Sequence, residues 1–319
     1  MARVVVGMIL PLLARALVAP RAGIRGAAAP RAAVPAWQSA LDEIDSAAWR
    51  DVRAAVYGSA DASAPAHLQR FEAYCEARRT ETVGDLLSVD GGRRVLYATE
   101  VYPNLTAVPS WDVRGDARLA WLAALEDPAT VAALRDEVRK TRRWRETTWV
   151  DTYDHDGAYD SGWGMVHLNE GHFPVAEAAL AAVAAPLAPR FASVARQRAG
   201  TAIHRHADRV PWILTAHLPL AGPRNAYLVV DGNRVPWTPG VATVTDTTFF
   251  HSAHNDHATE DALLLHVDFY HPDLDDAEVA ALATLHAELD RAEARRKAEL
   301  RPFVARLESA WHGESAPPC

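Results

Sequence analysis

Cysteine is scarce in this sequence, with only Cys75 and Cys319 among 319 residues. Two cysteines cannot build a disulfide framework or a zinc module that depends on several thiolate ligands. Long hydrophobic runs are also missing. No stretch of about 18 apolar residues follows the N-terminal region, whereas a membrane-spanning helix needs about 20. The sequence therefore excludes a disulfide-rich scaffold and predicts a mature chain without a transmembrane segment.

An excess of positive charge is absent too. The chain has 33 Lys and Arg against 41 Asp and Glu, which gives a formal net charge of -8. A protein that binds nucleic acid mainly by electrostatics needs a basic face, so we expect no nucleic-acid partner. With 49% hydrophobic and 23% charged residues, the composition is that of a globular protein with one large domain or two smaller ones.

Acidic residues are absent from positions 1–41, which contain five arginines. Residues 4–14 form an apolar run that is interrupted by Pro11 and followed by Arg15. Three interpretations stay open: a signal peptide, an organelle transit peptide, or an untranslated or disordered extension from a mispredicted start. They imply secretion, organelle import or a cytoplasmic location in turn, and each excludes residues 1–36 from the fold.

The spacing of apolar residues predicts helices at both ends of the chain and strands between them. Helices are expected at 37–56, 66–78, 119–140, 174–185 and 275–311, the last as one helix or as a pair broken near Pro302. Asp127-Pro128 marks a helix start within 119–140. Strand-like pieces are expected around 84–97, a turn-rich loop at 102–112, and mostly strands at 147–270.

This order of elements is typical of an α+β protein whose β-barrel or sandwich core has helical flanks. Four segments follow: an N-terminal targeting or disordered segment (1–36), a mainly helical region (37–146), the strand-rich core (147–274) and a helical C-terminal tail (275–319).

Histidine is abundant where cysteine is not, with 14 in the chain and eight of them between residues 204 and 271. If residues 201–208 form a strand, His204, His206 and Asp208 share one face and Arg205 points away. A more distant His251 could complete a site of two histidines and one carboxylate, which suits non-haem iron. The residues alone leave open whether His204 or His206 is the ligand. They are also compatible with a partly buried histidine on a polar strand.

Several motifs in a fixed order resemble those of the aspartyl/asparaginyl β-hydroxylase family, which is Fe(II)- and 2-oxoglutarate-dependent. The resemblance is strong over residues 162–274 and weaker around Tyr102 to Asp112. The matching motifs are Gly200-Thr201 with His206, His217-Leu218, Arg234 with Trp237 and Gly240, Asp246 with Phe249 and His251, and Val267-Asp268 with His271-Pro272 and Leu274.

This resemblance implies a double-stranded β-helix, the jelly-roll barrel also found in cupins, with helices at both ends. It implies that His206 and His251 bind iron and that His217 lies beside the cosubstrate. A site of His204, His206 and His251 is the alternative. The His-x-Asp pattern is similar to that of the free-proline hydroxylases, so Asp208 becomes the third metal ligand. Otherwise Asp208 is an exposed residue paired with Arg205 or Arg209.

The cosubstrate residues of the family are altered in this chain. The arginine that would clamp the distal carboxylate of 2-oxoglutarate falls on Ala262, or on Asp261 by another count, and a serine falls on Ala195. Candidates to replace the clamp are His266, Arg198 and Arg196, although the two arginines could simply be solvated.

Substrate recognition should differ as well, because Thr215 stands at the family's substrate-carboxylate arginine. Candidates to line the pocket are Arg209, Trp212, Arg224 and Tyr227, with core packing as the other interpretation of Trp212. His254 and His257 could support the metal ligands or lie in solvent.

We therefore expect an oxidoreductase that uses Fe(II), 2-oxoglutarate and O2, with His206, Asp208 and His251 as the metal ligands. Its substrate would be an amino-acid residue in a peptide, a free amino acid or a small metabolite. One alternative is a metalloenzyme of the same fold that does not use 2-oxoglutarate, because the clamp arginine is missing. A second is a degenerate barrel that binds a ligand without catalysis.

Overall fold

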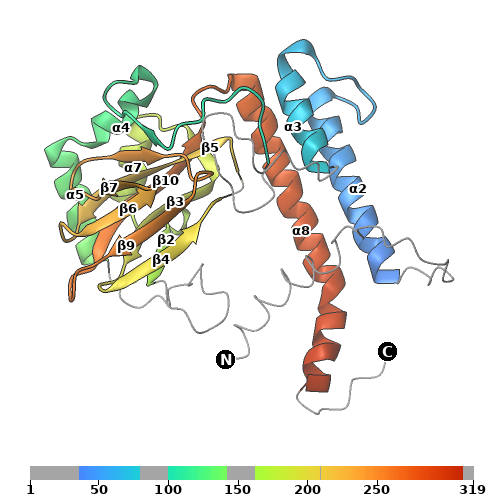
Figure 1. Cartoon of the computed structure of the whole chain (residues 1–319). Coiled ribbons are helices and arrows are strands. Elements are labelled where there is room, and N and C mark those ends of the chain that lie inside the picture. The colour runs from blue at the N-terminus through green and yellow to red at the C-terminus, as the bar shows by residue number, and fades with distance from the viewer. Residues whose placement is uncertain (1–35, 80–99, 142–161, 209, 312–319) are drawn as a thin grey trace. The chain divides into compact units, whose positions relative to one another are not determined.

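The computed structural model describes residues 36–79, 100–141, 162–208 and 210–311 (Figure 1). The chain divides into two compact units, Pro65–Ala283 and a second unit made of Met1–Ala64 with Thr284–Cys319. The predicted N-terminal targeting segment, the strand-like pieces at 84–97 and Arg209 lie outside the described residues. The four segments expected from composition stay a prediction.

The unit Pro65–Ala283 is built on two antiparallel sheets, one of six strands and one of four. The larger sheet has the order β1-β8-β5-β10-β3-β2, with bounds Ser110–Trp111, Thr243–Thr245, Ile213–Ala221, Ala262–Tyr270, Leu187–Gln197 and Trp163–His167. The smaller sheet has the order β4-β9-β6-β7, with bounds Thr201–His206, His251–Asn255, Ala226–Val230 and Asn233–Pro236.

Eight consecutive strands pair in a nested pattern. β3 pairs with β10, β4 with β9, β5 with β8 and β6 with β7, so the first strand meets the last and the innermost two form a hairpin. Successive strands cross between the two sheets, which is the connectivity of a double-stranded β-helix or jelly roll. The predicted α+β class and its jelly-roll core are therefore confirmed.

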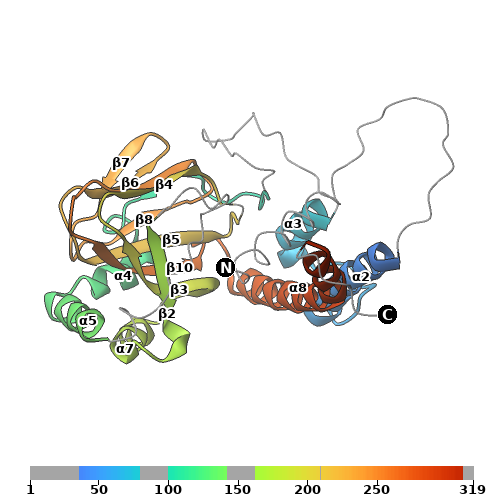
Figure 2. The same ribbon diagram turned by 90° about the horizontal axis from the view of Figure 1, so that it is seen from below.

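The larger sheet is buried on both faces. Its outer face packs against η3 (Ala117–Leu119), α4 (Ala120–Leu125), α5 (Pro128–Lys140), η4 (Leu168–Glu170) and α7 (Pro174–Ala182), which lie on one side of the barrel in Figure 2. Its inner face meets the smaller sheet around a second apolar cluster that includes Ala195, Ile203, Leu228 and Leu264. Double burial explains why β5 and β10 are buried along nearly their whole length.

Local sequence sets the helices that cover the barrel. Asp127 caps α5 by accepting a hydrogen bond from the Thr130 backbone N–H at 2.9 Å, and Pro128 occupies the first turn. The Glu137 carboxylate, near the end of α5, accepts the backbone N–H groups of Val175 and Ala176 at the start of α7. The helix start predicted at Asp127-Pro128 is confirmed.

The remaining helices are α2 (Ala36–Tyr57), η1 (Ala66–Leu68), α3 (Gln69–Arg79) and α8 (Asp276–Trp311). They confirm the predicted helices at 37–56, 66–78 and 275–311. α8 stays helical through Pro302, so the single helix is confirmed and the alternative of a pair broken there is wrong. Within the second unit α2 and α8 are joined by Arg296, whose Nε donates to Asp45 at 2.7 Å.

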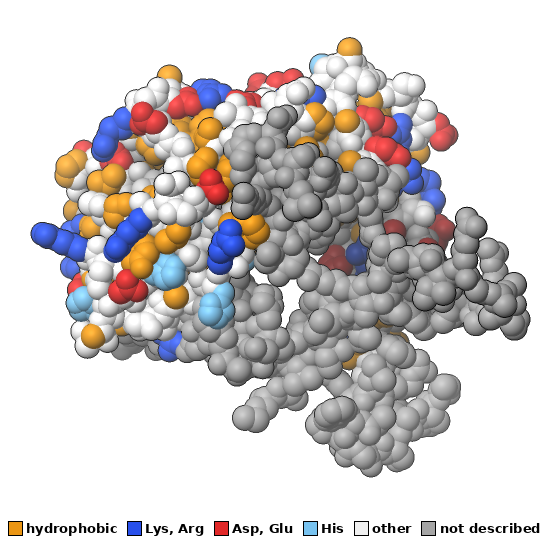
Figure 3. Space-filling model, viewed as in Figure 1, with side chains coloured by type: hydrophobic (Ala, Val, Ile, Leu, Met, Phe, Trp, Pro, Cys, Tyr) orange, Lys and Arg blue, Asp and Glu red, His pale blue; other side chains and the backbone are white. Residues whose placement is uncertain are grey.

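Charged side chains of both signs are interspersed on the face of the barrel shown in Figure 3. Among the described residues of this face, no extended region carries one sign of charge. No helix in the described parts of the chain is long and apolar enough to cross a membrane.

Candidate metal centre

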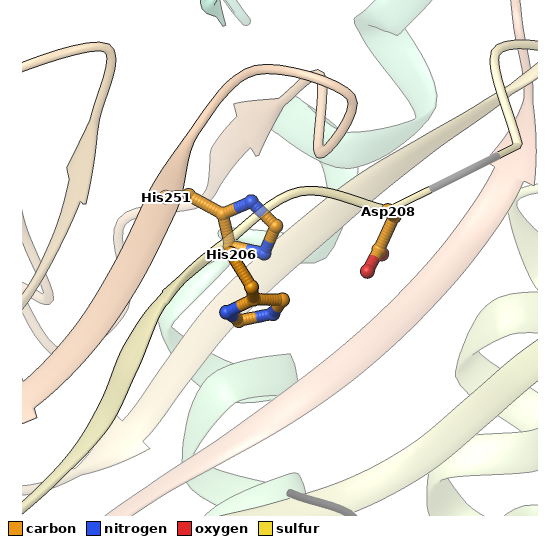
Figure 4. Close-up of side chains that lie close together, drawn as sticks. All are labelled: His206, Asp208 and His251. Carbon is orange, nitrogen blue, oxygen red and sulfur yellow. The ribbon is translucent and has the colours of Figure 1, made fainter. Parts of the chain in front are cut away.

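Two neighbouring strands of the smaller sheet bring the candidate ligands together. His206 is the last residue of β4 and His251 the first of β9, and the two are register partners with ring centroids 4.1 Å apart. Asp208 follows β4 and lies beside them (Figure 4). One ligand atom from each of His206, Asp208 and His251 lies within 4.8 Å of the other two. The predicted set of three ligands thus meets in space.

A β-bulge positions His206. Ile203 pairs with Ala253, but His206 pairs with His251, so β4 carries one extra residue between these pairs. As a result Ile203 is buried and both His204 and Arg205 are exposed. The prediction that His204 shares a face with His206 and Asp208 is wrong, because a bulge interrupts the alternation of an ideal strand. His204 therefore lies outside the group of ligand atoms.

Backbone carbonyls orient both imidazole rings. His206 Nδ1 lies 2.7 Å from the carbonyl oxygen of His204, and His251 Nδ1 lies 3.0 Å from that of Phe249. A carbonyl oxygen can only accept a hydrogen bond, so each neutral ring carries its proton on Nδ1. The Nε2 atom of each ring is then the one that would be available to a metal ion.

Asp208 is held as a carboxylate by an arginine from another strand. Arg190 Nη1 donates to Asp208 Oδ2 at 2.7 Å, and the Asp208 backbone N–H donates to Thr247 O at 2.7 Å. Burial raises the pKa of Asp208, but attraction by Arg190, and then by His251 and His206, outweighs this effect and lowers it. Asp208 is paired with an arginine, though not with Arg205.

The two alternative partners proposed for Asp208 are placed elsewhere. The guanidinium of Arg205 lies over the Phe250 ring at 3.9 Å. Arg209 is outside the described residues.

Arg190 was not predicted from the sequence, although it contacts more of the site than any predicted arginine. Its Nε donates to Asp268 Oδ2, and its Nη2 lies 3.4 Å from Thr215 Oγ1. The Thr215 hydroxyl donates to Asp268 Oδ1 at 2.7 Å. Burial raises the pKa of Asp268, but the Arg190 charge outweighs burial and lowers it. Asp268 lies within a strand motif, which indicates that a cationic side chain is buried beside it. The sequence does not show which side chain this is.

A pair of histidines lies in the barrel interior beside this network. His217 Nε2 is 3.0 Å from His266 Nδ1, and His266 Nε2 is 3.4 Å from Asp268 Oδ1. The rings of Trp163 and Trp237 lie 6.1 and 5.5 Å from His217. Burial, followed by repulsion from His266, holds the pKa of His217 well below its usual range. The structure brings His217 and His266 together, and their role toward a cosubstrate stays a prediction.

Ala262, one of the two positions to which the expected clamp was counted, is apolar and closed. Ala262 is buried in the cluster that contains Trp163, Trp237 and Ala195. It also meets Gly222, where an added Cβ would stand 2.9 Å from the Ala262 Cα. Residue 262 itself therefore provides no cationic group here, as the sequence indicated.

The two arginines named as replacements lie at the other end of the barrel from the ligands. Arg198 follows β3, and its backbone N–H donates to Gly162 O at 2.9 Å. It precedes the start of β4, whereas His206 ends that strand, a separation of roughly 17 Å at the usual rise per residue. Arg196 lies 3.7 Å from Asp261. The assignment of Arg198 to the cosubstrate stays a prediction.

Two of the other predicted pocket residues, Trp212 and Tyr227, pack against neighbouring side chains. Trp212 donates from Nε1 to the Tyr74 hydroxyl at 2.9 Å and stacks on Tyr270, which supports core packing. Tyr227 is stacked with His254 and covered by the Arg234 guanidinium. Arg224 is exposed.

The remaining histidines of the cluster make contacts of their own in loops and in β9. His257 Nδ1 accepts the backbone N–H of Glu260 at 2.9 Å, and His254 Nε2 lies 2.8 Å from Ser252 Oγ. His271, in the last matching motif, is buried and lies 3.0 Å through Nε2 from Thr106 O. None of these contacts involves the three candidate ligands.

Two imidazoles and one carboxylate whose ligand atoms lie within 4.8 Å of one another fit a divalent metal ion. This donor set suits non-haem iron, because it leaves the opposite side of the ion open to other ligands. Residues 128–272, which contain all three ligands, match the family described as Aspartyl/Asparaginyl beta-hydroxylase. This segment of the chain is therefore similar to that family.

Three solved structures illustrate the wider similarity. The non-haem α-ketoglutarate-dependent epimerase SnoN from nogalamycin biosynthesis is 18% identical over 48% of this chain and 81% of its own, with a TM-score of 0.36. AviO1 from Streptomyces viridochromogenes Tue57 is 17% identical over 53% and 99%, with a TM-score of 0.32. A Cupin 2 barrel protein from Salinispora arenicola is 23% identical over 30% and 72%, with a TM-score of 0.23. Similarity at these TM-scores says nothing about function. No curated protein matches the chain.

Proposed function

We propose that this protein is a non-haem Fe(II) oxygenase that uses 2-oxoglutarate and O2 to hydroxylate a C–H bond. Its substrate would be an amino-acid residue in a peptide, a free amino acid or a small metabolite. The observation that carries the proposal is the convergence of His206, Asp208 and His251 within 4.8 Å, inside the segment that matches the hydroxylase family. Bound iron would supply the activation of O2 that oxidation of such a bond needs.

The chain's own residues prepare this site before any metal binds. The carbonyls of His204 and Phe249 hold the Nδ1 atoms of the two rings, which leaves each Nε2 for the metal. Arg190 holds one oxygen of Asp208, which restricts the carboxylate. A preorganised ligand set loses little conformational entropy on binding.

The charges around the site also favour a divalent cation. Asp208 and Asp268 are both held ionised, and Arg190 neutralises one of the two negative charges. One negative charge is left for the metal, within a barrel interior that is otherwise apolar or neutral. Attraction between opposite charges is stronger there than in bulk water.

Anaerobic titration tests the proposal. Metal-free protein is loaded with Fe(II) under nitrogen and then with 2-oxoglutarate, and the visible spectrum is recorded. A weak charge-transfer band is expected only when both are present. His206→Ala should abolish the band, whereas His204→Ala should keep it, because the neighbouring His204 is exposed and outside the ligand group. Bound iron without a band on adding 2-oxoglutarate would contradict the cosubstrate.

The second candidate is a metal-dependent oxygenase, or another metalloenzyme of this fold, that does not use 2-oxoglutarate. The observation in its favour is Ala262, which is buried among Trp163, Trp237 and Gly222 where the family is expected to have its clamp arginine. Iron binding that is insensitive to 2-oxoglutarate in the same titration would support this candidate. Failure to bind iron at all would support a non-catalytic barrel.

A further inference from the structure

Arg190 lies in an irregular stretch of β3 that allows its side chain to reach the metal centre. Residues 188–191 of β3 stand opposite the single residue Asp268 of β10, because the register shifts there. Bulges of this kind re-aim a side chain and are common beside active sites. The Arg190 side chain is only 19% exposed, whereas arginines are usually found at the surface. Its position is therefore a feature of the barrel that needs an explanation.

Contacts on several sides hold the guanidinium of Arg190 in place. Its Nε donates to Asp268 Oδ2, and its Nη2 lies 3.4 Å from Thr215 Oγ1. Asp268 and Thr215 are register partners on neighbouring strands and are joined by a hydrogen bond of 2.7 Å. The Phe191 ring lies 5.3 Å from the guanidinium carbon. The guanidinium cannot shift without breaking contacts to residues that are themselves fixed.

Arg190 divides its donors between two carboxylates. Its Nη1 donates to Asp208 Oδ2 at 2.7 Å, whereas its Nε is used by Asp268. A fork-shaped pair with Asp208 alone would have engaged both oxygens of that carboxylate. In this arrangement Arg190 takes Oδ2 and leaves Oδ1 to a metal ion.

Oδ2 cannot join Oδ1 on the metal without a loss elsewhere. A carboxylate can bind a metal ion through one oxygen or through two. Binding through two would turn Oδ2 away from Arg190, and the guanidinium could not follow because Asp268 holds it. A charge-assisted hydrogen bond would be lost, and such bonds are stronger than those between neutral groups. The Asp208 backbone is also held, since its N–H donates to Thr247 O at 2.7 Å.

We propose that Arg190 is a positioning residue that keeps Asp208 a ligand through one oxygen, and that it thereby preserves a coordination position for O2. This inference rests on the proposed function. Two imidazoles and one carboxylate oxygen fill about half of the roughly six positions of non-haem iron. A chelating 2-oxo acid takes two more, which leaves one for O2. A second oxygen from Asp208 would fill this last position.

A purely structural role for Arg190 predicts a different result. If Arg190 were only the counter-ion of Asp268, its loss would lower stability and loosen metal binding. If it positions Asp208, its loss should reduce the number of open positions on the metal while the metal stays bound. The two roles therefore differ in a property that stability measurements do not detect.

Counting the water molecules on bound Mn(II) tests the inference without 2-oxoglutarate. Mn(II) accepts the same ligands as Fe(II) and speeds the relaxation of the protons of its bound water. The unaltered protein should leave about three water positions on the metal. Arg190→Met combined with Asp268→Asn removes the guanidinium together with the charge that needs it. This double variant should leave about two, and it should bind Mn(II) at least as tightly.

Nitric oxide, used as a stable substitute for O2, reports on the last position. It is added to the anaerobic protein with Fe(II) and 2-oxoglutarate, and electron paramagnetic resonance measures the complex. The double variant should still bind 2-oxoglutarate, but its affinity for nitric oxide should fall by at least about tenfold, because Asp208 now competes for that position.

Two controls separate these effects from general perturbation. Asp268→Asn alone keeps the contact between Arg190 and Asp208, so the count should stay at about three waters. Arg205→Met places the same new side chain next to His206 but at an exposed position, and it should change neither measurement. The count in the unaltered protein decides the inference even if the double variant does not fold.

The outcomes distinguish this inference from the proposed function. About two waters in the unaltered protein, or about three in a folded double variant, overturns the inference and leaves the function standing. A folded double variant that no longer binds Mn(II) shows a structural role and also overturns it. The expected counts without the visible band on adding 2-oxoglutarate overturn the function and leave the role of Arg190 toward Asp208. An unaltered protein that binds neither Mn(II) nor Fe(II) overturns both.

Discussion

Asp208 stands between two cationic partners, Arg190 on one side and the proposed metal on the other. Arg190 contacts only Oδ2, so Oδ1 stays available to a metal ion. Arg190 also forms an ion pair with the buried Asp268, and no other cation in the described interior neutralises that carboxylate. At the scale of single residues, the site therefore depends on one ligand and on the arginine behind it.

Asp208→Ala should lower the affinity for Fe(II) or Mn(II) by at least about 10–100-fold, because an anionic ligand is lost and two neutral rings remain. Competition with a fluorescent chelator measures this change. His204→Ala, two positions from His206 but exposed, should leave the affinity as it is. An unchanged affinity in Asp208→Ala would show that two histidines suffice.

Arg190→Gln should destabilise the barrel by about 3–5 kcal/mol, because it leaves the buried charge of Asp268 without the arginine that neutralises it. Urea unfolding followed by tryptophan fluorescence measures the loss. Arg205→Gln is the matched control, since Arg205 is exposed.

A double variant, Arg190→Gln with Asp268→Asn, checks the cause assigned to this loss. It should recover part of the stability, because it removes the stranded charge. Equal losses in the single and double variants would contradict that cause.

At the scale of elements, β4 is defined at both ends by contacts outside its own sequence. Its last residues are set by the bulge against β9. Its first residue, Thr201, lies against Gly162, which has a φ of +63°. A Cβ at Gly162 would stand 2.1 Å from Thr201 Oγ1, so this close approach requires glycine.

Gly162→Ala should therefore destabilise the protein more than Gly232→Ala does. Both positions have positive φ, but an added Cβ at Gly232 meets nothing within 4 Å. The steric clash should add about 1–3 kcal/mol to the backbone strain that the two variants share. Thermal unfolding of the two variants side by side gives this difference. Equal melting temperatures would show that Thr201 moves aside without cost.

At the scale of the whole molecule, helices on the outer face allow the barrel to hold a polar interior. α4, α5 and α7 cover the larger sheet with an extensive apolar cluster. The inner face can then carry His217, His266 and Asp268 without being the main source of stability. Function and packing are separated onto the two faces of the same strands.

The stability of the metal-free protein should fall as pH decreases from 7 to 5. Burial and repulsion by His206 lower the pKa of His251 to about 4, and the pKa of His217 is lowered too. A histidine with a depressed folded pKa contributes stability above its unfolded value of about 6.5, and this is lost as pH falls. For His251 the loss is about 2 kcal/mol.

Urea unfolding at the two pH values measures the slope. His251→Gln should show a shallower dependence, and His254→Gln, on the outer side of the same strand, should behave as the unaltered protein does. Equal slopes in all three would contradict the role assigned to burial.

The sequence by itself predicted the types of element and the candidates for the metal ligands. Helix periodicity and the Asp127-Pro128 cap are local signals. The predicted cap was confirmed because a cap depends only on the first turn of its own helix. The residues alone left His204 and His206 open as ligands, and the family resemblance favoured His206 with Asp208 and His251, whose ligand atoms the structure brings together. The resemblance places the clamp at Ala262 or Asp261, and neither residue is an arginine.

Only the tertiary structure decided the contacts that depend on how the strands pair. The bulge that separates His204 from His206 arises where β4 meets β9, and no property of residues 201–208 alone reveals it. Arg190 meets Asp208 and Asp268 only because the nested pairing brings three strands together. His217 and His266 are register partners across β5 and β10. The order of residues specifies helix caps and ligand types, whereas the register between strands is fixed by the free energy of the whole folded barrel.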